Sequence, residues 1–247
     1  ACLDDIEICD VDKNNELDFA LAGYWAGIYL FNSINKSFSN NYTIVGDSEN
    51  DGRGFTDIEF GDIDNDGSKD LISSTVDGRI IIYKNSNGSF TKTQTISNNR
   101  QSFKVKLIDI NNDGYLDIVT SFRSKSIAVF INNHGTFKST PDFVYDNGYG
   151  ALTFAVGDID NDGYKDVITI NNGSIIIFKN VKGTLSSVPI SFNNTFSCYA
   201  KDLKLVDLNK DGFLDLIVSN FNTPNCIFMN NHGQFDSKPS WTSGKVS

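Results

Sequence analysis

The sequence predicts an all-β fold, and three observations support this prediction. A nine-residue acidic segment recurs five times, with successive starts 47 to 52 residues apart, at Asp10, Asp62, Asp109, Asp158 and Asp207. Short runs of β-branched and aromatic residues recur at the same period, without a sustained helical pattern between them. Turns rich in Asn and Gly separate the runs. Four strands in each of five repeats predict a β-propeller with four-stranded blades.

The second repeat shows the order of the expected elements. Alternating residues 56–61 predict the first strand, and acidic residues 62–70 form a loop. A β-branched run over 71–75 predicts the second strand, and the apolar run 80–83 predicts the third. An Asn-rich turn with Gly follows, and Phe90 opens a fourth strand, as Phe137 and Phe235 do in their repeats.

The five repeats account for the whole chain, and we expect a single β-propeller domain over residues 1–247. Their approximate limits are 1–46, 55–96, 102–145, 151–192 and 199–242. We favour a closed five-bladed ring. The alternative is that the five repeats are a fragment of a larger propeller.

The acidic segments have the chemistry of a cation site. Their pattern is Asp-x-[Asp/Asn]-x-[Asp/Asn]-Gly-x-x-Asp, and oxygen donors at alternate positions gather around one point when the chain turns sharply. Gly at position 6 permits that turn. Oxygen donors at this density, without Cys or His, favour Ca²⁺ over a transition metal. Because apolar strands flank each loop, the sequence predicts a strand–loop–strand site and excludes an EF-hand.

The predicted ligands are positions 1, 3, 5 and 9 through their side chains and position 7 through its backbone carbonyl. The expected calcium-binding residues are therefore Asp62, Asp64, Asp66, Ser68 and Asp70; Asp109, Asn111, Asp113, Tyr115 and Asp117; Asp158, Asp160, Asp162, Tyr164 and Asp166; Asp207, Asn209, Asp211, Phe213 and Asp215; and Asp10, Asp12, Asn14, Glu16 and Asp18.

The first loop departs from the pattern, because Asn15 replaces Gly and Asn14 replaces an Asp. Asn tolerates the left-handed conformation better than most residues. We expect this site to be the weakest of the five.

The charge of the chain agrees with cation binding. The net charge is −10, and 17 of the 31 acidic residues are loop Asp residues. Up to five Ca²⁺ ions would cancel it. Turn capping alone is the simpler alternative, but the crowded carboxylates would repel one another without a cation. The acidity also argues against nucleic acid as a partner, and the apolar runs are too short for membrane insertion.

Segments such as Phe60-Gly61-Asp62-Ile-Asp-Asn-Asp-Gly67 and Val156-Gly157-Asp158-Ile-Asp-Asn-Asp-Gly163 resemble FG-GAP (VCBS) repeats. These repeats build the calcium-binding propeller of integrin α chains and of several secreted lectins and bacterial surface proteins. The resemblance implies that the calcium loop joins the first and second strands of a blade, and that ligands engage the opposite face. Seven blades are commonest in that family, whereas this chain carries five repeats.

Arginines and aromatic residues gather where the opposite face is expected. They lie in turns between second and third strands or in links between repeats, and the candidate ligand-binding residues are Tyr24, Trp25, Arg53, Arg79, Arg100, Arg123, Tyr149 and Phe221. Such residues are enriched at binding hot spots. The alternative is that these arginines only keep the surface soluble.

The function expected from these features is a calcium-stabilised recognition or adhesion module for a protein or glycan. The alternatives are a lyase-like enzyme acting on polysaccharides and a structural spacer. No catalytic residue can be singled out, and His134 and His232 recur in the same turn, which favours a structural role for both. Because calcium sites of ordinary affinity fill outside cells, we expect a secreted or cell-surface protein, periplasmic or extracellular in a bacterium.

The four cysteines lie only in the first and last repeats, at Cys2, Cys9, Cys198 and Cys226. In a closed ring these repeats are neighbours, so a disulfide at the seam and four free thiols are both open alternatives.

Overall fold

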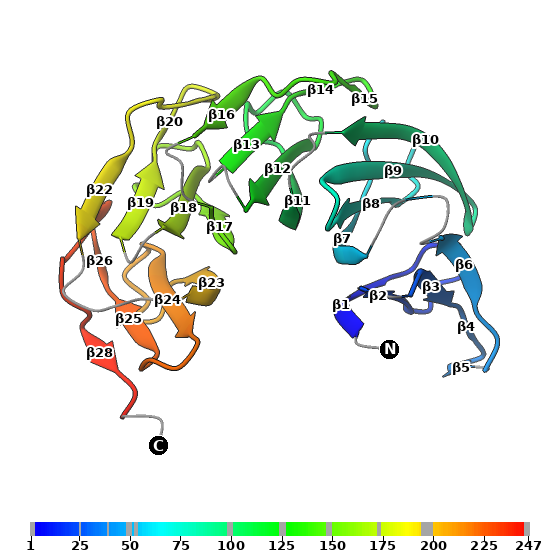
Figure 1. The fold of residues 1–247 in the computed structure, drawn as a ribbon, viewed down its shortest axis with the longest axis horizontal. Coiled ribbons are helices and arrows are strands. Elements are labelled where there is room, and N and C mark those ends of the chain that lie inside the picture. Colours follow the sequence, from blue (N-terminus) through cyan, green and yellow to red (C-terminus); the bar gives the residue numbers. More distant parts are fainter. Residues whose placement is uncertain are drawn as a thin grey trace. The chain divides into compact units, whose positions relative to one another are not determined.

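A computed structural model describes residues 3–24, 26–38, 40–47, 51, 54–97, 101–123, 127–146, 150–171, 174–193 and 200–244. All regular secondary structure in these residues is β, which confirms the predicted all-β class (Figure 1). The described part of the chain contains no helix that could cross a membrane.

Five four-stranded antiparallel sheets follow one another along the chain, and we number them sheets 1 to 5. Sheet 1 is β1 (Leu3–Cys9), β2 (Asp18–Gly23), β3 (Ile28–Phe31) and β6 (Thr43–Gly46); sheet 2 is β7 (Phe55–Gly61), β8 (Asp70–Thr75), β9 (Arg79–Ser86) and β10 (Ser89–Ser97); sheet 3 is β11 (Ser102–Ile108), β12 (Asp117–Phe122), β13 (Ile127–Phe130) and β16 (Phe143–Tyr145); sheet 4 is β17 (Phe154–Gly157), β18 (Asp166–Asn171), β19 (Ser174–Phe178) and β22 (Ile190–Asn193); sheet 5 is β23 (Ala200–Val206), β24 (Asp215–Asn220), β25 (Cys226–Phe228) and β28 (Trp241–Thr242). In each sheet the strands pair in chain order, as the repeat pattern predicts.

Two-stranded ribbons interrupt four of the five sheets between the third and fourth strands. They are β4 (Ser33–Ile34) with β5 (Ser37–Phe38), β14 (Asn132–Asn133) with β15 (Thr136–Phe137), β20 (Asn180–Val181) with β21 (Thr184–Leu185), and β26 (Asn230–Asn231) with β27 (Gln234–Phe235). Phe137 and Phe235 therefore open a ribbon strand, and the fourth strand of the sheet starts later. Only Phe90 lies in a continuous fourth strand, because β9 and β10 run on through the turn.

The chain divides into two compact units. The first comprises Ala1–Asp109 and Gly114–Val144, and the second comprises Ile110–Asp113 and Tyr145–Ser247. A single domain over the whole chain, the predicted repeat limits and closure of a ring all remain predictions.

Apolar clusters between the faces of consecutive sheets form the core of each unit. In the first unit, Ala20 and Leu30 of sheet 1 pack in one cluster with Leu71 and Tyr83 of sheet 2. A second cluster there joins sheets 2 and 3. In the second unit, one cluster joins sheets 4 and 5. This packing fixes the positions of the strands, and therefore also the positions of the loops at the ends of each sheet.

One face of sheet 1 is less covered than its equivalents. The aromatic residue near the end of the third strand is fully buried in sheets 2 to 5, as Tyr83, Phe130, Phe178 and Phe228. Its equivalent in sheet 1, Phe31, is only partly buried and stacks on Phe19 with ring centroids 4.7 Å apart. Neighbouring Phe38 and Tyr42 on this face are about half exposed.

Candidate metal centres in the acidic loops

Each acidic loop joins the first strand of a sheet to the second, as predicted. We number the loops 1 to 5, for residues 10–18, 62–70, 109–117, 158–166 and 207–215. The position-6 residue has a positive φ in every loop, namely Asn15 (66°), Gly67 (83°), Gly114 (90°), Gly163 (89°) and Gly212 (90°). Asn15 thus takes the same conformation as the glycines, which confirms that Asn can replace Gly here.

The first Asp of each loop holds the turn through backbone hydrogen bonds. In loop 2, Asp62 accepts hydrogen bonds from the N–H groups of Asp66 and Gly67, at 3.1 and 2.8 Å. Loop 4 repeats both bonds with Asp158, at 3.1 and 2.8 Å, and loop 5 with Asp207, at 3.1 and 2.9 Å. The loops therefore share one conformation that does not depend on the residues between these positions.

The last Asp of each loop is fully buried and anchors the loop to its sheet. In loop 2, Asp70 accepts the N–H of Ile63 at 3.1 Å and the N–H of Asn85, in the third strand β9, at 2.9 Å. Burial raises the pKa of Asp70, and likewise that of Asp18 and Asp166, above the usual value for Asp. A cation beside a buried carboxylate stabilises its charged form.

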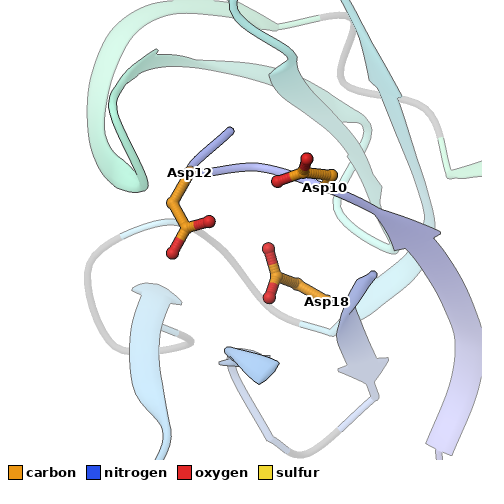
Figure 2. Close-up of side chains that lie close together, drawn as sticks. All are labelled: Asp10, Asp12 and Asp18. Carbon is orange, nitrogen blue, oxygen red and sulfur yellow. The ribbon is translucent and has the colours of Figure 1, made fainter. Parts of the chain in front are cut away.

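Three loops bring carboxylates close enough to share one ion. Ligand oxygens of Asp10, Asp12 and Asp18 all lie within 4.8 Å of one another, and Figure 2 shows the three side chains converging. The same spacing holds for Asp62, Asp64 and Asp66 in loop 2 and for Asp158, Asp160 and Asp166 in loop 4. Oxygens that bind one Ca²⁺ at about 2.3–2.6 Å can be at most about 5 Å apart, so these sets fit the ion.

Glu16 turns away from the carboxylates of loop 1. Its carboxylate accepts hydrogen bonds from the Ser33 hydroxyl, at 3.1 Å, and from the Lys36 N–H, at 3.0 Å. These contacts connect loop 1 to the ribbon of its own sheet. The side chain of Glu16 is therefore engaged elsewhere, and its backbone carbonyl stays the predicted calcium ligand at position 7, as in the other loops.

Loops 3 and 5 carry Asn at position 3, and its side-chain amide donates a hydrogen bond to the carboxylate at position 5. Asn209 Nδ2 donates to Asp211 Oδ2 at 2.8 Å, and Asn111 Nδ2 donates to Asp113 Oδ2 at the same distance. The position-7 rings pack against the turn histidines, with Tyr115–His134 and Phe213–His232 centroids both 4.6 Å apart. Both histidines have positive φ, so they occupy equivalent turn positions, as their recurrence in the repeat predicts.

Two lysines reach into the acidic loops, and the sequence pattern did not reveal them. Lys84 Nζ lies 2.5 Å from Asp64 Oδ1, 2.8 Å from Asp70 Oδ2 and 3.8 Å from Asp66 Oδ2. Lys179 Nζ lies 2.6 Å from Asp160 Oδ2 and 3.2 Å from Asp166 Oδ2. Lys84 lies near the end of the third strand β9, and Lys179 directly follows the third strand β19. This shared place in the repeat is a signal that the sequence does contain.

In sheets 2 to 5, a buried Asn at the turn that follows the third strand ties a repeat to the loop before it. Asn132 Nδ2 donates to the carbonyls of Ile63, in loop 2, and Leu116, both at 2.8 Å, and its Oδ1 accepts the N–H of Gly135 at 2.7 Å. Asn85, Asn180 and Asn230 make equivalent bonds to the carbonyls of Val11, Ile110 and Ile159. Sheet 1 has Ser33 at this position.

The predicted ligand-binding residues are only partly described. Trp25, Arg53, Arg100 and Tyr149 lie outside the described residues. Tyr24 and Phe221 are exposed, at 36% and 64%. Arg79 pairs with Asp77 at 3.3 Å, and Arg123 donates to Gln101 Oε1 at 2.6 Å. Within each sheet these turns lie at the opposite end from the acidic loop, as predicted.

The cysteines are also partly described. Neither Cys9 nor Cys226 forms a disulfide, and the two residues are half-buried and buried respectively. Cys2 and Cys198 lie outside the described residues, so the alternatives of a disulfide at the seam and of free thiols both stay open for them.

A model of the FG-GAP-like repeat matches the chain three times, over residues 62–120, 109–169 and 158–218. Together these matches span well over half of the chain, and each begins at the first Asp of an acidic loop. No curated protein sequence matches the chain.

Among solved structures, the chain is similar to Sqt1 of Saccharomyces cerevisiae, with 12% identity and a TM-score of 0.65 over 95% of this chain and 60% of that one. It is also similar to BBS1N in complex with ARL6DN, in crystals soaked with lead (13% identity, TM-score 0.62, 92% of this chain and 66% of that one) and with mercury (15%, 0.58, 90% and 65%). The chain thus spans about two thirds of these structures or less. At such low identity the likeness shows a propeller-like fold alone.

Proposed function

Because this chain belongs to the family of FG-GAP-like repeat proteins, we propose that it is a calcium-stabilised recognition module that binds a protein partner outside the cell. The single observation that carries this proposal is the set of five acidic loops, which share a left-handed residue at position 6 and a buried Asp at position 9. A loop conformation repeated five times favours a shared role as a turn that holds a cation.

Calcium is the cation that best fits the loops. Their side-chain donors are oxygens, and three carboxylates converge in loop 1 without a neighbouring lysine among the described contacts. Asn32 Oδ1 also lies buried without a described hydrogen-bond partner, and Asn32 Nδ2 and Asp12 Cβ lie near the same point beside Gly88, at 3.9 and 3.0 Å from its ideal Cβ. Calcium bound here would link the first and second strands, so it would stabilise the sheet.

A protein partner is favoured over a glycan. One structurally similar protein, BBS1N, was solved in complex with ARL6DN, and no comparison points to a carbohydrate. Turns at the ends of rigid sheets are common sites of recognition. We therefore place the partner surface at the turns between second and third strands, which include Tyr24, Arg79, Arg123 and Phe221.

Calcium also supports the proposed location. Sites of micromolar to millimolar affinity fill outside cells and stay largely empty in cytosol. A module that needs such ions for stability would work at a cell surface, after secretion or in a periplasm.

A capture experiment tests the recognition function. The immobilised chain is exposed to extracellular proteins from its own source in calcium and in EGTA, beside a variant with Arg79→Glu, Arg123→Glu and Phe221→Ser. We expect the same polypeptide to bind in calcium, and to be lost both in EGTA and with the variant. Equal retention by the wild type and a folded variant would contradict the proposed surface.

A further inference from the structure

We infer that loops 2 and 4 carry their own cation, the ammonium group of a lysine, and that Lys84 and Lys179 exclude calcium from these two sites. The inference rests on the proposed calcium binding and deepens it, because it states which of the five loops take the ion.

The first step is the position of the ammonium groups. Lys84 Nζ lies within 4 Å of three of the four carboxylates of loop 2, Asp64, Asp66 and Asp70. An ion that bound the same oxygens would have to lie where this nitrogen lies. Because a nitrogen and a metal ion cannot share that space, the two cations exclude each other.

Loop 4 repeats the arrangement in the second unit. Lys179 Nζ contacts Asp160 and Asp166, and its side chain is 20% exposed, compared with 23% for Lys84. The two ammonium groups therefore occupy equivalent places in loops 2 and 4.

The second step is the distribution of lysine among the repeats. The residue before the buried Asn, or before Ser33 in sheet 1, is Asn32, Lys84, Ile131, Lys179 and Met229 in repeats 1 to 5. Lysine occurs only where a loop has four Asp residues at positions 1, 3, 5 and 9, which are loops 2 and 4. Loops 1, 3 and 5 have three, with a neutral residue at the lysine position.

This pairing has a direct electrostatic cause. A fourth carboxylate in a crowded loop raises the repulsion among the acidic groups, and a tethered ammonium offsets it at all calcium concentrations. The residues at this position in repeats 1, 3 and 5 are neutral and supply no such ammonium. Loop 1, which the sequence pattern ranks as the weakest site, then becomes a principal calcium site.

The test counts calcium ions bound per chain by elemental analysis, after equilibrium dialysis against calcium. We expect three ions for the wild type, one more for Lys84→Met, one more for Lys179→Met and five for the double variant. Methionine is the matched choice, because Met229 occupies the equivalent position beside loop 5. Lys138→Met, which removes a lysine paired with Asp142 away from the loops, should leave the count unchanged.

The reciprocal variant, Asn32→Lys, introduces a lysine beside loop 1 and should remove one ion. Lys84→Met should also lower the melting temperature in EGTA and recover it in calcium. A count that Lys84→Met and Lys179→Met leave unchanged would overturn the inference. A wild type that binds no calcium would instead overturn the proposed calcium function, whatever the lysine variants do.

Discussion

Asp57 shows how a single residue makes stability depend on pH. It lies on β7, where its Oδ2 accepts the Val105 N–H at 2.7 Å. Burial, followed by the charge of Asp5, raises the pKa of Asp57 to about 8, while Lys104 acts in the opposite direction. Between pH 4 and 8 the folded chain therefore keeps a proton that the unfolded chain releases, and the free energy of unfolding falls as pH rises.

Asp57→Asn should remove this dependence, because the amide keeps the shape and cannot ionise. We expect the variant to gain on the order of 4 kcal/mol relative to the wild type between pH 5 and pH 8.5, because about three pH units at about 1.4 kcal/mol each lie below the raised pKa. Urea unfolding at both pH values measures the difference, and Asp236→Asn, at an exposed site, serves as the control. Parallel pH profiles for the wild type and Asp57→Asn would rule out the raised pKa.

Gly233 is required by space as well as by backbone conformation. An ideal Cβ on this residue would lie 2.6 Å from Asp160 Cβ in loop 4. Gly212 has a similar φ, 90° compared with 85°, but has no atom within 4 Å of its ideal Cβ. Substitutions at the two residues can therefore distinguish the cost of the steric contact from the cost of the backbone conformation.

We expect Gly212→Ala to cost about 1 kcal/mol of stability, the ordinary penalty for positive φ. Gly233→Ala should cost about 3 kcal/mol or more, because loop 4 must also shift. Chemical denaturation of both variants under the same calcium concentration provides the comparison. Equal losses would show that the close contact with Asp160 is unimportant.

At the scale of elements, the ribbon turns connect one repeat to the loop before it. The buried Asn132 makes three hydrogen bonds there, one to a carbonyl of loop 2, one to a carbonyl of loop 3 and one from the N–H of Gly135. Asn132→Ala should cost about 2–4 kcal/mol, because these groups lose their partners away from water. The exposed neighbour provides the control, and Asn133→Ala should change stability by less than about 0.5 kcal/mol.

Thermal unfolding of the two Asn variants distinguishes these expectations. A loss for Asn132→Ala no larger than that for Asn133→Ala would mean that the buried bonds do not hold the repeats together.

The order of the strands could be predicted from sequence because each signal is local. Period-2 patterning and the loop motif recur within each repeat, and antiparallel neighbours need only short turns. The ribbons were missed, although a signal exists. Pro141, Pro189 and Pro239 follow the ribbons of repeats 3 to 5, whereas repeat 2 has no proline there and its β10 is continuous. A proline lacks the N–H that a continuing strand needs.

The acidic loops were also predictable from the sequence. The lysine ammonium groups that lie in loops 2 and 4 were not. Position and residue type identify Asp64 and Asp70 as candidate ligands, because the motif lies in one continuous segment. Lys84 lies in the third strand, β9, 14 residues after Asp70, so only the pairing of strands brings it to the loop. Contacts of this kind depend on register and are not visible in a nine-residue motif.

At the scale of the whole molecule, sheet 1 differs from the other four. It has Ser33 where they have the connecting Asn, and Lys36 where they have the turn glycine. Phe19 and Phe31 are also less buried than their equivalents. If the predicted ring closes, its seam must therefore form without the hydrogen bond and the close glycine contact seen before the other sheets.

Calcium should control the stability of the whole chain, because an ion bound at each open loop favours the folded state. One site at a hundredfold excess over its dissociation constant contributes about 2.7 kcal/mol. The most direct measurement is the melting temperature in saturating calcium and in EGTA, with magnesium as the comparison cation. We predict a rise of about 10 °C or more in calcium and a smaller rise in magnesium. Identical melting temperatures in calcium and EGTA would contradict the account.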